Sequence, residues 1–231
     1  MGITLRNKWG STCLLAMAII LVFILPVRSY ALQIISGQGE EGLGSFTADI
    51  TYAQSGVLFL EIKNTSPVSN GGYITGIAFN NPNNIIQSVT GFDDGAFPAF
   101  QLIGGSSFQN GISGSPYGIF DIGASLNDSW LGSGKPDGGI APGKTGYFNF
   151  VFSGSASEIA RLTEESFVDE HSEGGAKSTF FIVRFRGFDN DGSDKVPGTT
   201  DPGSPVPEPG TLLLLGLGLI GVAIVLREMR R

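Results

Sequence analysis

The sequence predicts a mainly β fold, namely an antiparallel β-sandwich of immunoglobulin-like or jelly-roll type with one short helix. Three observations support this prediction. Short runs of residues alternate between apolar and polar side chains, and glycine-rich turns separate them in a chain with 35 glycines. In addition, one segment alone has helical spacing. Seven to nine short strands at such intervals are typical of two packed antiparallel sheets, and the spacing leaves the choice between the two topologies open.

Alternation sets the positions of the expected strands. SFTADITY at 45–52 places Phe46 and every second residue after it on one face. A short turn leads from it into VLFLEIKN at 57–64, which indicates a hairpin. TGYFNFVFS at 145–153 alternates in the same way. The other expected strands lie at 72–80, 85–92, 117–125 and 179–188.

The expected helix is SASEIARLTEESFVDE at 155–170. Ile159, Leu162 and Phe167 recur at roughly helical spacing and predict a narrow apolar stripe. Ser157 is the expected cap, because a serine side chain can accept a hydrogen bond from the amides that a helix start leaves unpaired.

Residues 1–31 are predicted to be a signal peptide. Arg6 and Lys8 precede a thirteen-residue apolar run at 13–25. Ser29-Tyr30-Ala31 then matches the small-x-small cleavage pattern, so cleavage is expected after Ala31. The ectodomain is predicted to span 32–190.

The composition beyond the signal peptide limits the possible functions. The chain's one cysteine, Cys13, lies inside the signal peptide, so neither a disulfide nor a thiolate metal site is expected in the secreted part. Residues 32–205 hold 8 Lys and Arg against 19 Asp and Glu, a net charge of −11. Nucleic acid is therefore not an expected partner, because its phosphates require a basic surface.

The C-terminal end of the sequence predicts a membrane anchor. Residues 211–226 are uncharged and long enough to form a short membrane-spanning helix. Arg227, Arg230 and Arg231 follow directly and predict a cytoplasmic end, which leaves the ectodomain on the outer side. Residues 191–209 are polar and rich in proline, so they are predicted to form an extended linker. The membrane helix and basic tail occupy 210–231.

This tail resembles the sorting signal of PEP-CTERM proteins. Pro207, Glu208 and Pro209 stand where that family has its motif, and the apolar helix and arginine cluster follow in the family's order. Gly210 replaces the alanine that the family often has. The resemblance implies that exosortase, a membrane protease of bacteria that make extracellular polysaccharide, recognises and cuts the tail. It transfers no catalytic residue to this chain.

GGIAPGKT at 138–145 fits the phosphate-binding pattern G-x-x-x-x-G-K-[ST]. Such a loop needs a buried strand before it and a helix after it. Here a turn-rich segment precedes the motif and an expected strand follows it. The motif is therefore interpreted as a turn that enters a strand, and no nucleotide is expected.

DNDGSD at 189–194 contains three carboxylates that suggest calcium: Asp189, Asp191 and Asp194. The EF-hand pattern fails, because Asp194 and Thr200 occupy its sixth and twelfth positions, where glycine and glutamate are required. A calcium loop of another kind and a solvated acidic turn both remain open. No other cofactor is expected.

No catalytic motif is found, and His171 is the chain's single histidine, in a polar segment expected to be a mobile loop. The protein is therefore not expected to be an enzyme. It is predicted to be an exported surface or matrix protein with a structural or adhesive role associated with extracellular polysaccharide. The alternative is a carbohydrate-binding module, assisted by calcium, in which Tyr117 and Trp130 stack on sugar rings.

Overall fold

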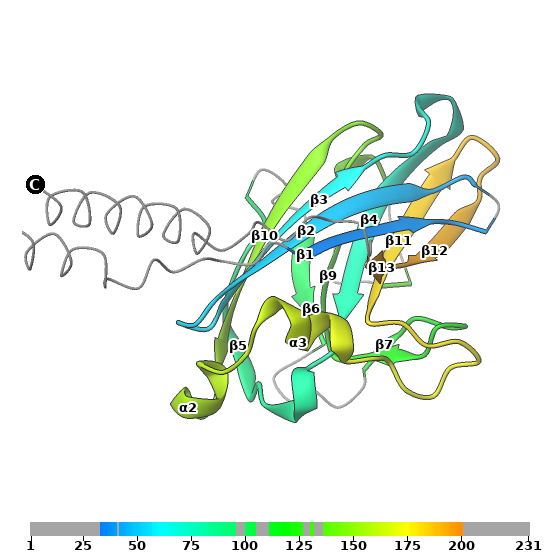
Figure 1. Ribbon diagram of the computed structural model, residues 1–231. Coiled ribbons are helices and arrows are strands. Elements are labelled where there is room, and N and C mark those ends of the chain that lie inside the picture. Colours follow the sequence, from blue (N-terminus) through cyan, green and yellow to red (C-terminus); the bar gives the residue numbers. More distant parts are fainter. Residues whose placement is uncertain are drawn as a thin grey trace, which may run out of the picture. The chain divides into compact units, whose positions relative to one another are not determined.

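The computed structural model describes residues 33–40, 42–95, 100–104, 111–126, 130–131 and 136–200 (Figure 1). The predicted signal peptide and tail lie outside these residues. So do Ala31, the motif residues Pro207, Glu208 and Pro209, and the arginines Arg227, Arg230 and Arg231. Within the described ranges, no helix has the length and apolarity that crossing a membrane requires.

The described strands form antiparallel sheets, which confirms the predicted mainly β class. One six-stranded sheet has the order β13-β1-β2-β3-β10-β5, and a five-stranded sheet has the order β12-β11-β4-β9-β6. A two-stranded sheet joins β7 and β8. The bounds are β1 Gln33–Gln38, β2 Ser45–Ala53, β3 Val57–Asn64, β4 Gly71–Phe79, β5 Ser88–Asp93, β6 Phe100–Ile103, β7 Ile112–Ser113, β8 Ile119–Phe120, β9 Ile122–Leu126, β10 Thr145–Ser153, β11 Phe181–Phe188, β12 Ser193–Pro197 and β13 Thr199–Thr200.

Alternation explains the strands of the six-stranded sheet. In β2, β3 and β10 every second side chain is buried, while the residues between them face outward. Successive side chains of a strand point to opposite faces, so this pattern brings one face of the sheet to the core. β3 pairs with β2 on one side and with β10 on the other. The predicted hairpin of 45–52 and 57–64 is confirmed.

Aromatic contacts join the two large sheets across one apolar core. The rings of Phe79 in β4 and Phe150 in β10 lie 5.2 Å apart and meet edge to face. Phe46 in β2 lies 5.8 Å from Phe181 in β11. Such pairs each contribute about 0.5–1.5 kcal/mol beyond the burial of their area. The core therefore explains most of the phenylalanines without any ligand.

The predicted helix at 155–170 is two short helices, α2 Ala156–Ile159 and α3 Glu164–Asp169, which lie at one end of the sheets (Figure 1). Ser157 is not the cap. Ser155 occupies the N-cap position of α2, and Thr163 that of α3. Thr163 has an extended backbone and its amide donates to Ser166 Oγ at 3.1 Å. The predicted helix is split in two because Thr163 is the N-cap of a second helix, α3.

These helices close one end of the core. Ile159, Leu162 and Phe167 are buried as their spacing predicted. The Tyr52 hydroxyl donates to the carbonyl of Ile159 at 2.9 Å, and the Tyr52 amide donates to Glu164 Oε1 at 2.8 Å. The helices thus supply acceptors for polar groups of β2 that would otherwise be buried without partners.

The predicted linker at 191–209 is wrong in its first part, and so is the domain boundary at 190. β12 pairs with β11, and β13 pairs with β1. Val196 in β12 is fully buried in the core. Polar residues can form an edge strand when one side chain reaches the core, because a neighbouring strand supplies the hydrogen bonds.

A second, smaller apolar cluster covers the other face of the five-stranded sheet. Its members are Ala78, Ile112, Tyr117, Phe120, Trp130 and Ile182. Trp130 lies directly on the backbone of Gly76, where an added Cβ would be 2.8 Å from the indole Cζ3. The Trp130 Nε1–H donates to the Ser113 carbonyl at 2.8 Å. Glycine at position 76 is therefore what allows Trp130 to pack on this face.

Candidate functional site

A cleft of about 520 Å³ lies beside β12, the edge strand of the five-stranded sheet. Its walls come from segments far apart in the sequence. Glu40 follows β1, Ser115 and Tyr117 belong to the segment between β7 and β8, and Arg184 and Lys195 lie on β11 and β12. Its volume is within the range of about 300–1,000 Å³ that is typical of small-molecule sites.

Two cations face each other in this cleft. Arg184 of β11 is the direct cross-strand partner of Lys195 of β12. Side chains in that position start about 4.5–5.5 Å apart, and like charges there are destabilising. Burial lowers the pKa of Lys195, and the charge of Arg184 lowers it further. The pKa of Arg184 is also lowered, first by burial and then by Arg186.

The hydrogen bonds of these two cations do not neutralise them. Arg184 Nη2 donates to the Leu131 carbonyl at 3.0 Å, and Lys195 Nζ donates to the Ser115 carbonyl at 2.7 Å. Arg184 Nε is buried and has no hydrogen-bond partner within the part of the chain that the structure describes. Among the described residues, no carboxylate forms an ion pair with either side chain. The cleft thus holds two positive charges with neutral partners.

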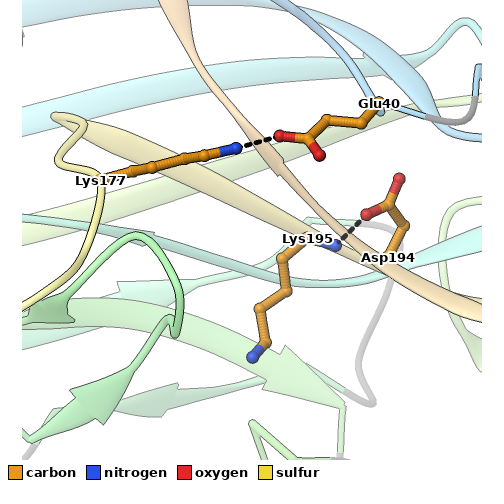
Figure 2. A network of polar contacts seen from close by, with 4 residues as sticks. All are labelled: Glu40, Lys177, Asp194 and Lys195. Atoms are coloured by element: carbon orange, nitrogen blue, oxygen red, sulfur yellow. Dashed lines mark hydrogen bonds and ion pairs between the residues drawn. The ribbon is translucent and has the colours of Figure 1, made fainter.

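A third cation is already paired. Lys177 forms an ion pair with Glu40, and Figure 2 shows the two side chains reaching toward each other from separate loops. The ammonium lies 5.6 Å from the centroid of the Tyr117 ring. The hydrogen bond to Lys177 lowers the pKa of Glu40, and the same bond raises the pKa of Lys177. Both side chains are exposed, so this pair contributes little to stability.

Asp194 lies on the opposite side of β12 from the side chain of Lys195 (Figure 2). Its Oδ1 accepts the backbone N–H of Lys195 at 2.7 Å. It packs against Gly39, where an added Cβ would be 2.0 Å from Oδ2. Of the acids that the structure describes in the cleft wall, Glu40 is held by Lys177 and Asp194 by the backbone.

The structure does not bring together the three predicted calcium ligands. Asp189 and Asp191 lie exposed in the turn between β11 and β12, while Asp194 lies on β12. The Asp191 amide donates to the Phe188 carbonyl at 2.8 Å, which closes a tight turn. No group of three or more histidine, cysteine or acidic residues in the described ranges is placed to hold a metal.

GGIAPGKT has the predicted structure of a turn that enters a strand. A 3-10 turn at Pro136–Gly138 ends on the first residue of the motif, and β10 begins at its last residue, Thr145. The Lys144 amide donates to the Ala141 carbonyl at 3.0 Å, with Gly143 at a φ of 77°. A strand therefore follows the lysine, where a phosphate loop would continue as a helix.

The structure also places three further residues that the sequence singled out, namely Tyr117, Trp130 and His171. Tyr117 and Trp130 are only 7% and 8% exposed, so the predicted stacking on sugars at an open surface is wrong for both. They lie inside the small apolar cluster. His171 is exposed and packs edge-on to Phe180 at 5.9 Å. Its loop is tied down by the Ser172 amide, which donates to the Thr179 carbonyl at 3.0 Å.

Sequence reasoning missed Arg184 and Lys195. The available signal was FIVRFRGF, in which Arg184 and Arg186 occupy the polar face of a strand inside a strongly acidic domain. Lys195, the cross-strand partner of Arg184, was not recognised as a strand residue, because residues 191–209 were predicted to be a linker.

The described part of the chain is a mainly β domain of packed antiparallel sheets. The family model of the PEP-CTERM protein-sorting motif matches residues 205–231, which confirms the predicted sorting signal at the C-terminal end of the chain. The motif implies an exported, membrane-anchored protein that the exosortase machinery processes. Comparison with curated proteins and with solved structures finds no match.

Proposed function

We propose that this protein is sorted to the cell surface or matrix and has a structural or adhesive role associated with extracellular polysaccharide. The observation that carries the proposal is the sorting motif at 205–231. The β-rich ectodomain supports it, because a rigid two-sheet fold suits a displayed, non-catalytic module. The net charge of −11 over residues 32–205 suits a protein that stays soluble outside the cell.

The tail contains sequence features that a membrane protease can recognise. Pro207 and Pro209 have no backbone N–H and fix φ near −65°, so the tripeptide enters the membrane helix in extended form. Glu208 adds a negative charge on the outer side. Arg227, Arg230 and Arg231 keep the far end in the cytoplasm. Cleavage near the motif would then release the ectodomain from its membrane helix.

Replacement of Pro207, Glu208 and Pro209 by alanine tests this step. Export should continue, but the full-length protein should stay in the inner membrane. A matched control replaces Asp201 and Pro202, an acid and a proline that lie before the matched motif. Mass spectrometry of the surface fraction decides the question. Intact peptides from 211–226 in wild-type material outside the cell would contradict the proposal.

A carbohydrate-binding module is the second candidate, and the cleft beside β12 favours it. The cleft combines charged and hydrogen-bonding side chains with Leu131, which is 70% exposed. The structure gives calcium assistance no support in the described residues. A glycan array probed with and without chelator tests both points. The expected result is glycan binding that chelator leaves unchanged.

A further inference from the structure

We propose that the cleft beside β12 binds a uronic acid residue of a polysaccharide, with the sugar carboxylate between Arg184 and Lys195. The inference rests on the proposed association with extracellular polysaccharide and names the chemistry of the recognised sugar. It comes from the register of β11 and β12, which sets the two cations directly opposite each other.

The unliganded arrangement is electrostatically unfavourable. Two like charges at directly opposite strand positions repel each other, and the acids of the cleft wall are engaged elsewhere. An anion bound between the two side chains is attracted by both positive charges, and this attraction offsets their mutual repulsion. Arginine presents a planar fork of donors that matches a carboxylate, and lysine adds a second charge from the other strand. A carboxylate is therefore the group that the pair accommodates best.

The surroundings of Arg184 and Lys195 favour a ligand with one negative charge over a polyanion. Glu40 and Asp194 lie in the same cleft wall and would repel further anions. The domain as a whole is acidic, and its field extends about 8 Å at physiological ionic strength. Nucleic acid or polyphosphate requires an extended basic surface. A sugar with a single carboxylate fits the small positive centre.

The rest of the cleft suits the remainder of a sugar ring. Ser193 and Asn190 provide hydrogen-bonding groups near the turn between β11 and β12. Leu131 and Pro116 provide apolar surface for the C–H face of a ring. Sugar sites combine these two kinds of surface, with a few placed polar groups that fix orientation.

Binding of the methyl glycoside of galacturonic acid, which has a single carboxylate, to the detergent-solubilised full chain tests the proposal by calorimetry. The probe is compared with its methyl ester, which has the same ring without the charge. The acid should bind at least about tenfold more tightly, because a charge-assisted hydrogen bond is worth about twice a neutral one. Arg184→Gln and Lys195→Gln should each weaken binding of the acid about tenfold and leave binding of the ester nearly unchanged.

Lys144→Gln is the matched control, since it removes an exposed lysine outside the cleft wall and changes the net charge equally. Circular dichroism checks that each variant is folded. If Arg184→Gln fails to fold, the partly exposed Lys195 still decides the question. Equal binding of acid and ester, acid binding that survives both substitutions, or no binding of the acid would each overturn the proposal. A sulfated oligosaccharide that binds more tightly than the uronate would also overturn it.

The tail substitutions alter sorting in the cell and leave the cleft intact. A failed sorting experiment alongside successful uronate binding would therefore refute the proposed destination alone. The reverse result would refute the ligand alone.

Discussion

At the scale of single residues, Arg184 and Lys195 form an unfavourable pair in the free protein. A double-mutant cycle with Arg184→Gln and Lys195→Gln isolates their interaction from their separate hydrogen bonds. We expect a repulsive coupling of about 0.2–1 kcal/mol, as for like charges on opposite strand positions. Urea unfolding measures it, and added salt should reduce it by screening. An attractive coupling would contradict the arrangement described.

Tyr52 gives the domain a sensitivity to alkaline pH. Burial raises the pKa of its hydroxyl to about 12, above the usual value of about 10. The folded state thus holds this proton more tightly than the unfolded state. The resulting stability is fully present below pH ~10 and is lost as the pH rises through ~12. A shift of this size corresponds to a stabilisation of roughly 3 kcal/mol.

Tyr52→Phe should therefore lower stability at pH 9 by about 1 kcal/mol, through loss of the hydrogen bond to the Ile159 carbonyl. It should also flatten the fall in stability between about pH 10 and 12. Urea unfolding across this range measures both effects. Tyr147→Phe is the control, because Tyr147 is 53% exposed. An unchanged alkaline slope in the Tyr52 variant would refute this account.

At the scale of elements, strands with one buried face were predictable from the sequence. The expected strands at 57–64 and 145–153 coincide with β3 and β10. Each alternates over its whole length, so the pattern alone identifies the buried face. β1 and β12 were missed, because each buries a single apolar side chain, Ile35 or Val196. Pairing with β2 and β11 makes these segments strands, and a local pattern does not contain that information.

Truncation tests where the domain ends. A chain that stops at 190 loses β12 and β13, whereas one that stops at 200 keeps both. The shorter chain should be less stable by at least about 1.5–3 kcal/mol, the value of burying a side chain such as Val196. It also exposes the edge of β11, which should promote aggregation. Equal urea midpoints for the two chains would mean that β12 contributes no stability.

At the scale of the whole molecule, the tail was recognisable from sequence and the cleft was not. The tail's motif, helix and arginines follow one another, so a linear pattern contains all of them. The cleft joins Glu40, Tyr117, Arg184 and Lys195, which come together only when both sheets have formed. None of these residues belongs to a local sequence motif that would identify it. Prediction of the cleft would have required the pairing of β11 with β12.

The position of β13 has a mechanical consequence. If the exported protein is held through its C-terminal end, tension enters the described domain at Thr200, the end of β13, and the strand before β13 contains Lys195. In the described residues, β13 is joined to β1 through two residue pairs, Ile35 with Thr200 and Ser36 with Thr199. Because the strands are antiparallel, tension at Thr200 separates these pairs one after another. A polysaccharide bound at the proposed site would then be connected to such a tether mainly through β12.

Force spectroscopy on single molecules held at the C-terminal end and at a cysteine introduced at Val68, which is 80% exposed, should resolve this. We expect a small, reversible first extension of less than about 25–30 Å, because residues 193–200 reach at most that length when pulled straight and are already extended as strands. Rupture of the packed sheets should follow only at higher force. A single rupture of the whole domain would contradict this order. Under tension, the protein would yield at its last strands and keep its core folded, so that strain on the surface layer is absorbed and recovered.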